Sequence, residues 1–536
     1  MTRSETIRRK IKSLAPDALH RSWARVQASP LGLRLVSGVF WSMSGTVLAQ
    51  VLTMALAIIT ARMLGKEGFG ELSVLGNTTS LFATFAGIGL GMTSTKYIAE
   101  FRRTDPARAG RIVGLSAVVV MTSSAVLGLL MFALAPVLAN QALNAPQLVT
   151  GLRISSFMLF FSTVIGAQTG VFMGLESFKT IAYLNVLDGL IRFPLTLAGL
   201  YLGQLTGVVI GQTLATGIVW LVSFIVLRIE MPRAGIAISY RGLGRELSVI
   251  WNYSVPLLIS SVMVGPIQWV VVTFLAHQPR GYDELGLWSA CKRADTLLLF
   301  LPGIFMRVAM PMMSSAFGEG SGSGKDQSNK IMMSTFSLTV AVIFPAGVAL
   351  MFGSDLFMMM FGRDFSAGAV VLVGVVMNDL MIGAGTMGGT FLQAQGRMWL
   401  GFAINLVWGL LYVLIVWLSV ARFGANSLAF GSAVSFLILN VGVYAILWSY
   451  FPPGTARRVI YASFLAAGLA AASAPLTPAL RLTLCLPVLA VTTYLVVFKL
   501  VDPETRELFW SHFREPLPPG LTAAPEIPPG GKGDIG

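Results

Sequence analysis

The chain has 536 residues, of which 55% are hydrophobic and only 12% are charged. Soluble domains carry about 25% charged residues, so the composition excludes a soluble globular protein, and the apolar surplus must face lipid. A membrane barrel would show strands of about ten residues with alternating polarity, whereas the apolar runs here are uninterrupted and long enough for spanning helices. The sequence therefore predicts an all-α polytopic membrane protein.

The formal net charge is +14, with two cysteines and three histidines. We interpret this charge as the excess of Lys and Arg that cytoplasmic loops normally carry. The basic residues are spread over loops without a base-stacking or groove-reading motif, so we expect no nucleic-acid partner. Cys291 and Cys485 both lie in apolar segments, and His20, His277 and His512 are scattered. We expect no disulfide framework, no metal site and no cofactor.

The two ends of the chain differ from its middle. Residues 1–35 form a basic segment in which Ile7, Ile11 and Leu14 have the spacing of a short amphipathic helix on an anionic leaflet; a solvated tail is the alternative. The segment is not a cleavable signal peptide, because the apolar run that follows is far longer than a signal sequence contains. Residues 501–536 are rich in Pro and Gly, which predicts a disordered cytoplasmic tail.

Fourteen apolar stretches between these ends are candidate membrane spans. They are about 36–61, 70–95, 112–136, 150–173, 181–202, 205–227, 249–275, 285–313, 331–353, 366–391, 399–421, 424–448, 457–474 and 479–498. The second is rich in Gly, Ser and Thr, which suits close helix packing or a cavity wall better than a lipid-facing surface. With the N-terminus inside, 27 basic residues fall on the inner side and 6 in outer loops. This asymmetry predicts that both termini are cytoplasmic.

A weak internal repeat divides the spans. Phe40-Trp41 aligns with Ile250-Trp251, and a second similarity pairs residues 171–187 with 391–407. An offset of six helices keeps both halves in one orientation, which is typical of parallel repeats with a site near the midplane between them. The predicted units are a six-helix bundle at 36–228, a cytoplasmic linker at 229–248, a second six-helix bundle at 249–450 and two additional helices at 451–500.

Charged residues inside the spans are the candidate functional residues. The segment 286–311 contains Lys292, Arg293, Asp295 and Arg307, although each charge at the centre of a membrane helix costs roughly 2.5–3.5 kcal/mol on insertion scales. Arg293 and Arg307 differ by fourteen residues, so they share one helix face at depths about 21 Å apart. Lys292 and Asp295 are three residues apart and can pair.

Other spans add Asp188 and Arg192, which are four residues apart, together with Arg153 and Asp379. Alternatives remain open for each: a structural ion pair for Asp188–Arg192, snorkelling for Arg153 and Arg307, and a protonated carboxyl without a role for Asp379. Five basic and three acidic residues nevertheless leave the membrane interior with a positive excess. Such an excess suits an anionic cargo such as a lipid diphosphate, because guanidinium groups match phosphate geometry.

Two stretches resemble a known family. ARMLGKEGFGELSVL (61–75) is similar to the Arg-x-Leu-Gly…Phe-Gly signature of bacterial polysaccharide exporters, and GIGLGMTSTKYIAEF (87–101) to their Gly-Leu…Lys/Arg-Tyr-Ile-Ala stretch. With its predicted spans and repeat, the chain resembles Wzx-type oligosaccharide flippases of the multidrug/oligosaccharidyl-lipid/polysaccharide exporter superfamily. Glu71 departs from the apolar or aromatic residue that these proteins often have.

The resemblance implies a transporter that flips an undecaprenyl-diphosphate-linked oligosaccharide from the inner to the outer leaflet of the bacterial inner membrane, by alternating access of its halves. Its partners would be this lipid-linked substrate, the bilayer, H⁺ or Na⁺ and the polysaccharide polymerase or export machinery. The lipid tail would stay in the bilayer, so a lateral opening is expected. The diphosphate would be held by basic residues: Arg192, Lys292, Arg293, Arg307 and Arg153. Ion coupling would involve Asp188, Asp295 and Asp379, and the sugar would contact Asn252, Gln268 and Trp269.

Three alternatives share parts of this reading. A flippase for the peptidoglycan precursor has the same head-group chemistry, and a cation or drug antiporter of the same superfamily would be expected to have an acidic rather than a basic interior. A membrane-embedded glycosyltransferase or polymerase would be expected to carry catalytic groups in large outer loops. The outer loops here are short, with no nucleophile–base pair, so we expect a transporter and not an enzyme.

Overall fold

The chain folds almost entirely into helices. The computed structural model describes residues 30–249, 251, 254, 263–318, 322–395 and 397–507. Every regular element in these ranges is helical, and ten of their helices are long and apolar enough to cross a membrane. The predicted all-α polytopic class is therefore confirmed, whereas the count of fourteen spans and the two-fold repeat stay predictions.

The first half of the chain forms one bundle. Its elements are α3 (Pro30–Gly87), α4 (Leu90–Phe101), α5 (Pro106–Val137), η1 (Leu138–Ala142), η2 (Pro146–Leu148), α6 (Val149–Gly174) and α7 (Phe178–Arg233). Both long helices contain two segments joined at a kink, at Gly65 in α3 and at Gly203 and Gln204 in α7. Gly65 has a φ of 69°, a conformation that glycine adopts without a steric cost. Each kink joins two stretches that the sequence predicts as separate spans.

A short linker follows α7 and lies against the first bundle. It contains η3 (Leu243–Glu246) and α8 (Leu247–Val249). The Glu246 carboxylate is almost fully buried and pairs with Arg108 and Arg111 of α5, each at 3.1 Å. A buried carboxylate needs such partners to offset its lost hydration. The linker is thereby held to α5.

The second half forms the other bundle. Its elements are α10 (Val264–Ala276), α11 (Gly281–Cys291), α12 (Arg293–Leu298), α13 (Phe300–Gly318), α14 (Gly322–Phe352), α15 (Ser354–Met359), η5 (Arg363–Gly368), α16 (Ala369–Ala394), α17 (Met398–Phe423), α18 (Ala425–Ile446) and η6 (Trp448–Tyr450). The eighth predicted span is interrupted, because α11, α12 and α13 are separate helices. This interruption places Lys292 and Arg293 at a break in the helix.

The last helices, α19 (Thr455–Ser473), α20 (Pro478–Leu495) and η7 (Val496–Leu500), pack against the second bundle through α14, α16 and α18. Arg481 lies in this contact with a side chain that is only 4% exposed. Its guanidinium donates to the Ser473 carbonyl at 2.9 Å and pairs with Asp355 at 3.1 Å. Arg481, which the charge pattern assigns to an outer loop, is therefore a structural tie between α20 and α15.

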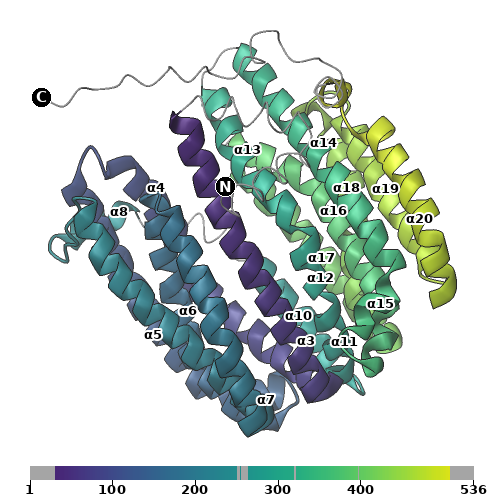
Figure 1. The fold of residues 1–536 in the computed structure, drawn as a ribbon, viewed down its shortest axis with the longest axis horizontal. Coiled ribbons are helices and arrows are strands. Elements are labelled where there is room, and N and C mark those ends of the chain that lie inside the picture. Colours follow the sequence, from purple (N-terminus) through teal and green to yellow (C-terminus); the bar gives the residue numbers. More distant parts are fainter. Residues whose placement is uncertain are drawn as a thin grey trace, which may run out of the picture.

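The two bundles meet at one end of the molecule. In Figure 1 the first half, purple to teal, and the second half, green to yellow, come together near the labels α3, α10 and α11 and diverge toward α4 and α13. The meeting end corresponds to loops that the charge distribution assigns to the outer side, such as the one around Arg363.

Close backbone contacts hold this end together. A side chain added at Gly70 of α3 would lie 2.0 Å from the carbonyl oxygen of Tyr282, and one added at Gly286 of α11 would lie 2.0 Å from that of Lys66. The Tyr282 hydroxyl donates to the Leu143 carbonyl at 2.7 Å. Only glycine permits the two helices to approach this closely.

We predict that Gly70→Ala pushes apart the ends at which the two bundles meet, because the added methyl group would overlap the carbonyl oxygen of Tyr282. Overpacking of this kind destabilises a packed contact by roughly 1–3 kcal/mol. Gly76→Ala is the matched control on the same helix, since nothing lies within 4 Å of a carbon added there. Spin labels at Glu67 and Arg363, which are exposed on opposite bundles, report the separation by electron paramagnetic resonance. A longer distance only in Gly70→Ala is expected; equal distances in both variants would contradict the role of this contact.

Candidate functional site

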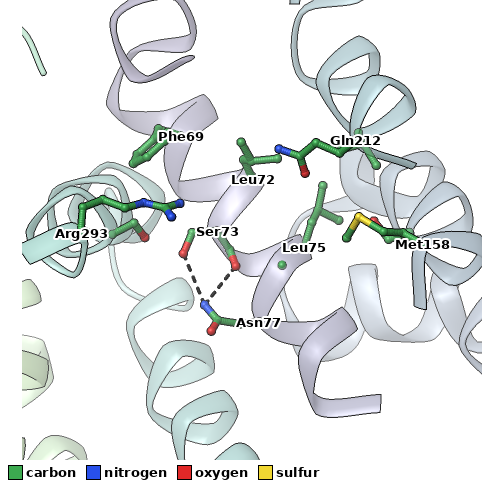
Figure 2. A pocket seen from close by; sticks show the side chains of 12 residues that line it. Phe69, Leu72, Ser73, Leu75, Asn77, Met158, Gln212 and Arg293 are labelled. Carbon is green, nitrogen blue, oxygen red and sulfur yellow. Dashed lines mark hydrogen bonds between the residues drawn. The ribbon is translucent and has the colours of Figure 1, made fainter. Parts of the chain in front are cut away.

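A polar cavity lies where the two bundles meet. Its volume is 260 Å³, and its lining comes from α3, α6, α7 and the α11–α12 break. Figure 2 shows Arg293 entering from one side and Gln212 and Met158 from the other, with Ser73 and Asn77 of α3 between them. The cavity therefore joins a cation from the second bundle to amide and hydroxyl groups from the first.

A second cavity of 430 Å³ lies between the first segment of α3 and α12–α13. Its lining is mostly aliphatic and aromatic, including Val51, Met54, Leu297 and Phe300. Arg293 lines this cavity as well as the polar one. One guanidinium thus stands between a polar compartment and an apolar one, which is the arrangement that a molecule with an anionic head and an apolar tail requires.

Lys292 and Arg293 are adjacent in sequence but have different surroundings. Lys292 lies between α11 and α12 and forms an ion pair with Asp295, as the sequence spacing predicts. Arg293 begins α12, and in the part of the chain that the structure describes it forms no ion pair. Its charge is therefore available to an anion in either cavity, whereas that of Lys292 is already neutralised.

The Lys292–Asp295 pair belongs to a buried polar cluster within the second bundle. Asp379 of α16 is fully buried and interacts electrostatically with both residues. Asn378 donates to the Asp379 carboxylate at 3.4 Å and accepts from Ser432 of α18 at 2.7 Å. These contacts bring together two of the predicted acidic residues and one predicted basic residue.

Three oxygen atoms of this cluster accept no hydrogen bond from a described donor: Asp295 Oδ1, Asp379 Oδ2 and Gln268 Oε1. The Asp295 and Asp379 carboxylates lie within hydrogen-bonding reach of each other, so one proton can be shared between them. Gln268, Asn378 and Lys292 surround a void of only 10 Å³, which is about the space of a single water molecule. Of the three oxygen atoms, only Gln268 Oε1 belongs to a residue that lines this void, and a void of this size excludes anything larger than a water molecule or a small ion.

The first bundle contains its own polar cavity, of 190 Å³, between α6 and the two segments of α7. Asp188 and Arg192 line it. Their side chains form an ion pair with two hydrogen bonds, of 2.7 and 3.1 Å, as their four-residue spacing predicts. The Arg192 guanidinium also lies 3.4 Å from the hydroxyl of Thr216. The structure therefore places Arg192 with Asp188 and not beside Arg293 among the residues lining the first cavity.

The remaining predicted residues lie elsewhere. Arg153 is exposed on α6 and stacks over the ring of Phe132 at 5.3 Å, outside the residues that line these cavities. Trp269 donates to Thr78 of α3 at 3.1 Å and so joins the two bundles. Asn252 and the side chain of Arg307 lie outside the residues that the structure describes.

Some residues of the site are not singled out by the sequence. Gln212, Ser73 and Asn77 line the central cavity, and Asn378 contacts Asp379. The small polar composition of the second predicted span indicates a cavity wall, and this expectation agrees with the position of Ser73 and Asn77. Gln212 and Asn378 are single amides in apolar helices, which give no comparable pattern.

Comparisons with known proteins agree with this geometry. A family described as polysaccharide biosynthesis protein matches residues 35–317, more than half of the chain. The EPS I polysaccharide export inner membrane protein EpsE of Ralstonia nicotianae is 19% identical over 36% of this chain, and the match spans 43% of that relative's length. The Lipid III flippase of Escherichia coli K12 is 23% identical over 53% of this chain and 68% of its own.

Solved structures share the fold. The inward closed conformation of the lipid II flippase MurJ has a TM-score of 0.62 at 13% identity, covering 89% of this chain and 98% of that one. An inward-facing MATE-family multidrug transporter of the MOP superfamily has a TM-score of 0.60 at 15% identity, covering 79% and 98%. Together with the match over residues 35–317, these findings confirm the predicted superfamily, and the chain belongs to the polysaccharide biosynthesis protein family.

Proposed function

We propose that the chain is a transporter that turns an undecaprenyl-diphosphate-linked oligosaccharide from the inner to the outer leaflet of the bacterial inner membrane. The position of Arg293 between a polar and an apolar cavity carries this proposal. An unpaired guanidinium can bind a diphosphate through two parallel hydrogen bonds. The apolar cavity beside it suits the prenyl chain, and the polar one suits the head group. The names of the EpsE and Lipid III flippase relatives support the same substrate class.

Two of the three alternatives fit this arrangement less well. A cation or drug antiporter would place an unpaired carboxylate where Arg293 stands, and the superfamily's multidrug members resemble this chain only in fold. A peptidoglycan-precursor flippase has the same diphosphate chemistry and differs only in the sugar. An enzyme of glycan transfer needs a nucleophile and a base at a reacting bond, which the lining of the two cavities does not provide.

Alternating access follows from the contact between the bundles. We propose two related six-helix halves, fourteen spans in all and both termini in the cytoplasm, so that the closed end faces outward. The lipid would enter laterally between α3 and α12, where the apolar cavity lies. Opening the Gly70–Gly286 contact and closing the opposite ends would then expose Arg293 to the outer leaflet. The polymerase or export machinery would receive the product.

The cluster around Asp379 is the proposed coupling site for H⁺ or Na⁺. Its three acceptor atoms without partners are available to a bound proton or sodium ion. Lys292 belongs to this cluster and is the neighbour of Arg293 in sequence. A change of charge at Asp379 would therefore act, through Lys292, on the arginine that binds the substrate. Intramembrane carboxylates commonly have this relay role.

We predict that Arg293→Ala slows translocation by roughly 10- to 100-fold, because hydrogen bonds to charged groups contribute about 1.5–3 kcal/mol. Arg293→Lys should recover only part of the rate, since an ammonium cannot make the paired contacts of a guanidinium. The measurement is the leaflet-resolved accessibility of the lipid-linked oligosaccharide in proteoliposomes. Arg153→Ala is the control, because Arg153 is exposed over Phe132. An Arg293→Ala rate equal to that of the control would refute the proposed role.

We predict that Asp379→Asn removes the dependence of translocation on an imposed proton or sodium gradient. The substitution keeps the volume of the side chain but removes the carboxylate that would bind the proton or the sodium ion. Translocation is measured in proteoliposomes with each gradient applied separately. Asp364→Asn, at an exposed position of η5, is the control. Full gradient dependence in Asp379→Asn would assign the coupling to another residue.

A further inference from the structure

The central cavity and the cavity of the first bundle lie along one face of the same two helices. On α6 the lining residues are Ser155 and Met158 in the central cavity and Ser162, Ile165 and Thr169 in the other. These positions follow a spacing of three, four, three and four residues, which keeps them on one side of an α-helix. The two cavities are therefore successive parts of one strip of the α6 surface.

The second segment of α7 repeats this spacing. Its lining residues are Val209 and Gln212 in the central cavity and Thr216, Val219 and Ser223 in the other. On each helix the strip spans fifteen residues, and the fourteen steps from the first to the last cover about 21 Å at 1.5 Å per residue. Two helices thus present parallel strips of the same length, starting opposite Arg293 and running along the first bundle.

Hydroxyl and amide groups are interspersed with apolar side chains along these strips. On α6 the order is Ser155, Met158, Ser162, Ile165 and Thr169. A sugar ring has hydroxyl groups at its edge and apolar C–H groups on its faces, so it can contact both kinds of side chain at once. A uniformly charged strip would suit phosphate instead, and a uniformly aliphatic one would suit a prenyl chain.

The pair Asp188–Arg192 forms the third wall and is electrically neutral. Its two hydrogen bonds, of 2.7 and 3.1 Å, leave Arg192 without the net charge that binds a diphosphate. Asp188 can still accept a hydrogen bond from a sugar hydroxyl group, and Arg192 can donate one to a hydroxyl oxygen. Ser223 also lies on the strip. The residue is 1% exposed, and its side-chain oxygen has no hydrogen-bond partner among the described residues. These groups provide donors and acceptors without net charge.

We propose that this groove, formed by the strips of α6 and α7 and the Asp188–Arg192 pair, binds the oligosaccharide of the substrate as an extended chain. The inference rests on the proposed flippase function and assigns its glycan subsite to the first bundle. Arg293 of the second bundle holds the diphosphate at one end of the groove, and the sugars extend from it toward Thr169 and Ser223. The groove residues then determine which glycan is carried. Arg192 and Asp188 serve hydroxyl recognition, in place of the diphosphate and ion-coupling roles that the sequence predicts for them.

Binding measurements on the full chain in nanodiscs test this proposal. The probes are the undecaprenyl-diphosphate-linked oligosaccharide extracted from the cells that produce the chain, and undecaprenyl diphosphate without sugar. The variant is Thr216→Val with Ser223→Ala. Thr213→Val is the matched control, because Thr213 is a buried threonine on the same helix whose hydroxyl donates to the Val209 carbonyl at 2.8 Å. Asn185→Ala tests the exposed rim of the groove, where a substitution leaves buried contacts intact.

The groove variants are expected to weaken binding of the sugar-bearing lipid by about tenfold, as the loss of one or two hydrogen bonds predicts, and to leave undecaprenyl diphosphate binding unchanged. Thr213→Val should change neither. Unchanged binding of the sugar-bearing lipid in both Thr216→Val/Ser223→Ala and Asn185→Ala overturns the glycan groove, as does an equal loss for both lipids. Arg293→Ala should weaken both lipids. If it weakens neither, the proposed flippase function fails, independently of the groove.

Discussion

A cation that stays unpaired inside a membrane protein is the feature on which the rest of the site depends. Lys292 and Arg293 follow each other at the boundary between α11 and α12, and successive residues of a helix point about 100° apart. Lys292 therefore reaches Asp295 and Asp379, whereas Arg293 lines the two cavities. One charge is paired within the second bundle, and the other is placed to bind an anion.

The two bundles divide the chemistry between them. The second bundle supplies the free cation and the buried acidic cluster, whereas the first supplies hydroxyl groups, amides and a neutral ion pair. The glycine contacts of α3 and α11 hold the bundles together at one end, so groups from both reach the same central cavity. A molecule that has an anionic centre, an apolar tail and a polar head can be held by such a division of charge.

Much of the fold could be predicted from the sequence, because lipid imposes simple rules on apolar length and backbone hydrogen bonding. Both ion pairs, Asp188–Arg192 and Lys292–Asp295, follow from helical spacing alone. The structure places Arg153 and Arg192 outside the residues that line the central cavity with Arg293, and helical spacing does not say which neighbouring helix a side chain meets. Arg481 shows the same difficulty, because an arginine in an outer loop and one buried against Asp355 look alike in sequence.

The sequence by itself determined the membrane class, the candidate spans, the positive charge of the interior and the local ion pairs, because each depends on composition or on residues within one helix. The tertiary structure decided which charge stays unpaired, that Gln212, Ser73 and Asn77 line the central cavity, and that one face of α6 and one face of α7 line both this cavity and that of the first bundle. These features depend on how separate helices rotate and kink against one another. That packing is set by contacts between residues far apart in the chain, such as Gly70 with Tyr282, which no local pattern reveals.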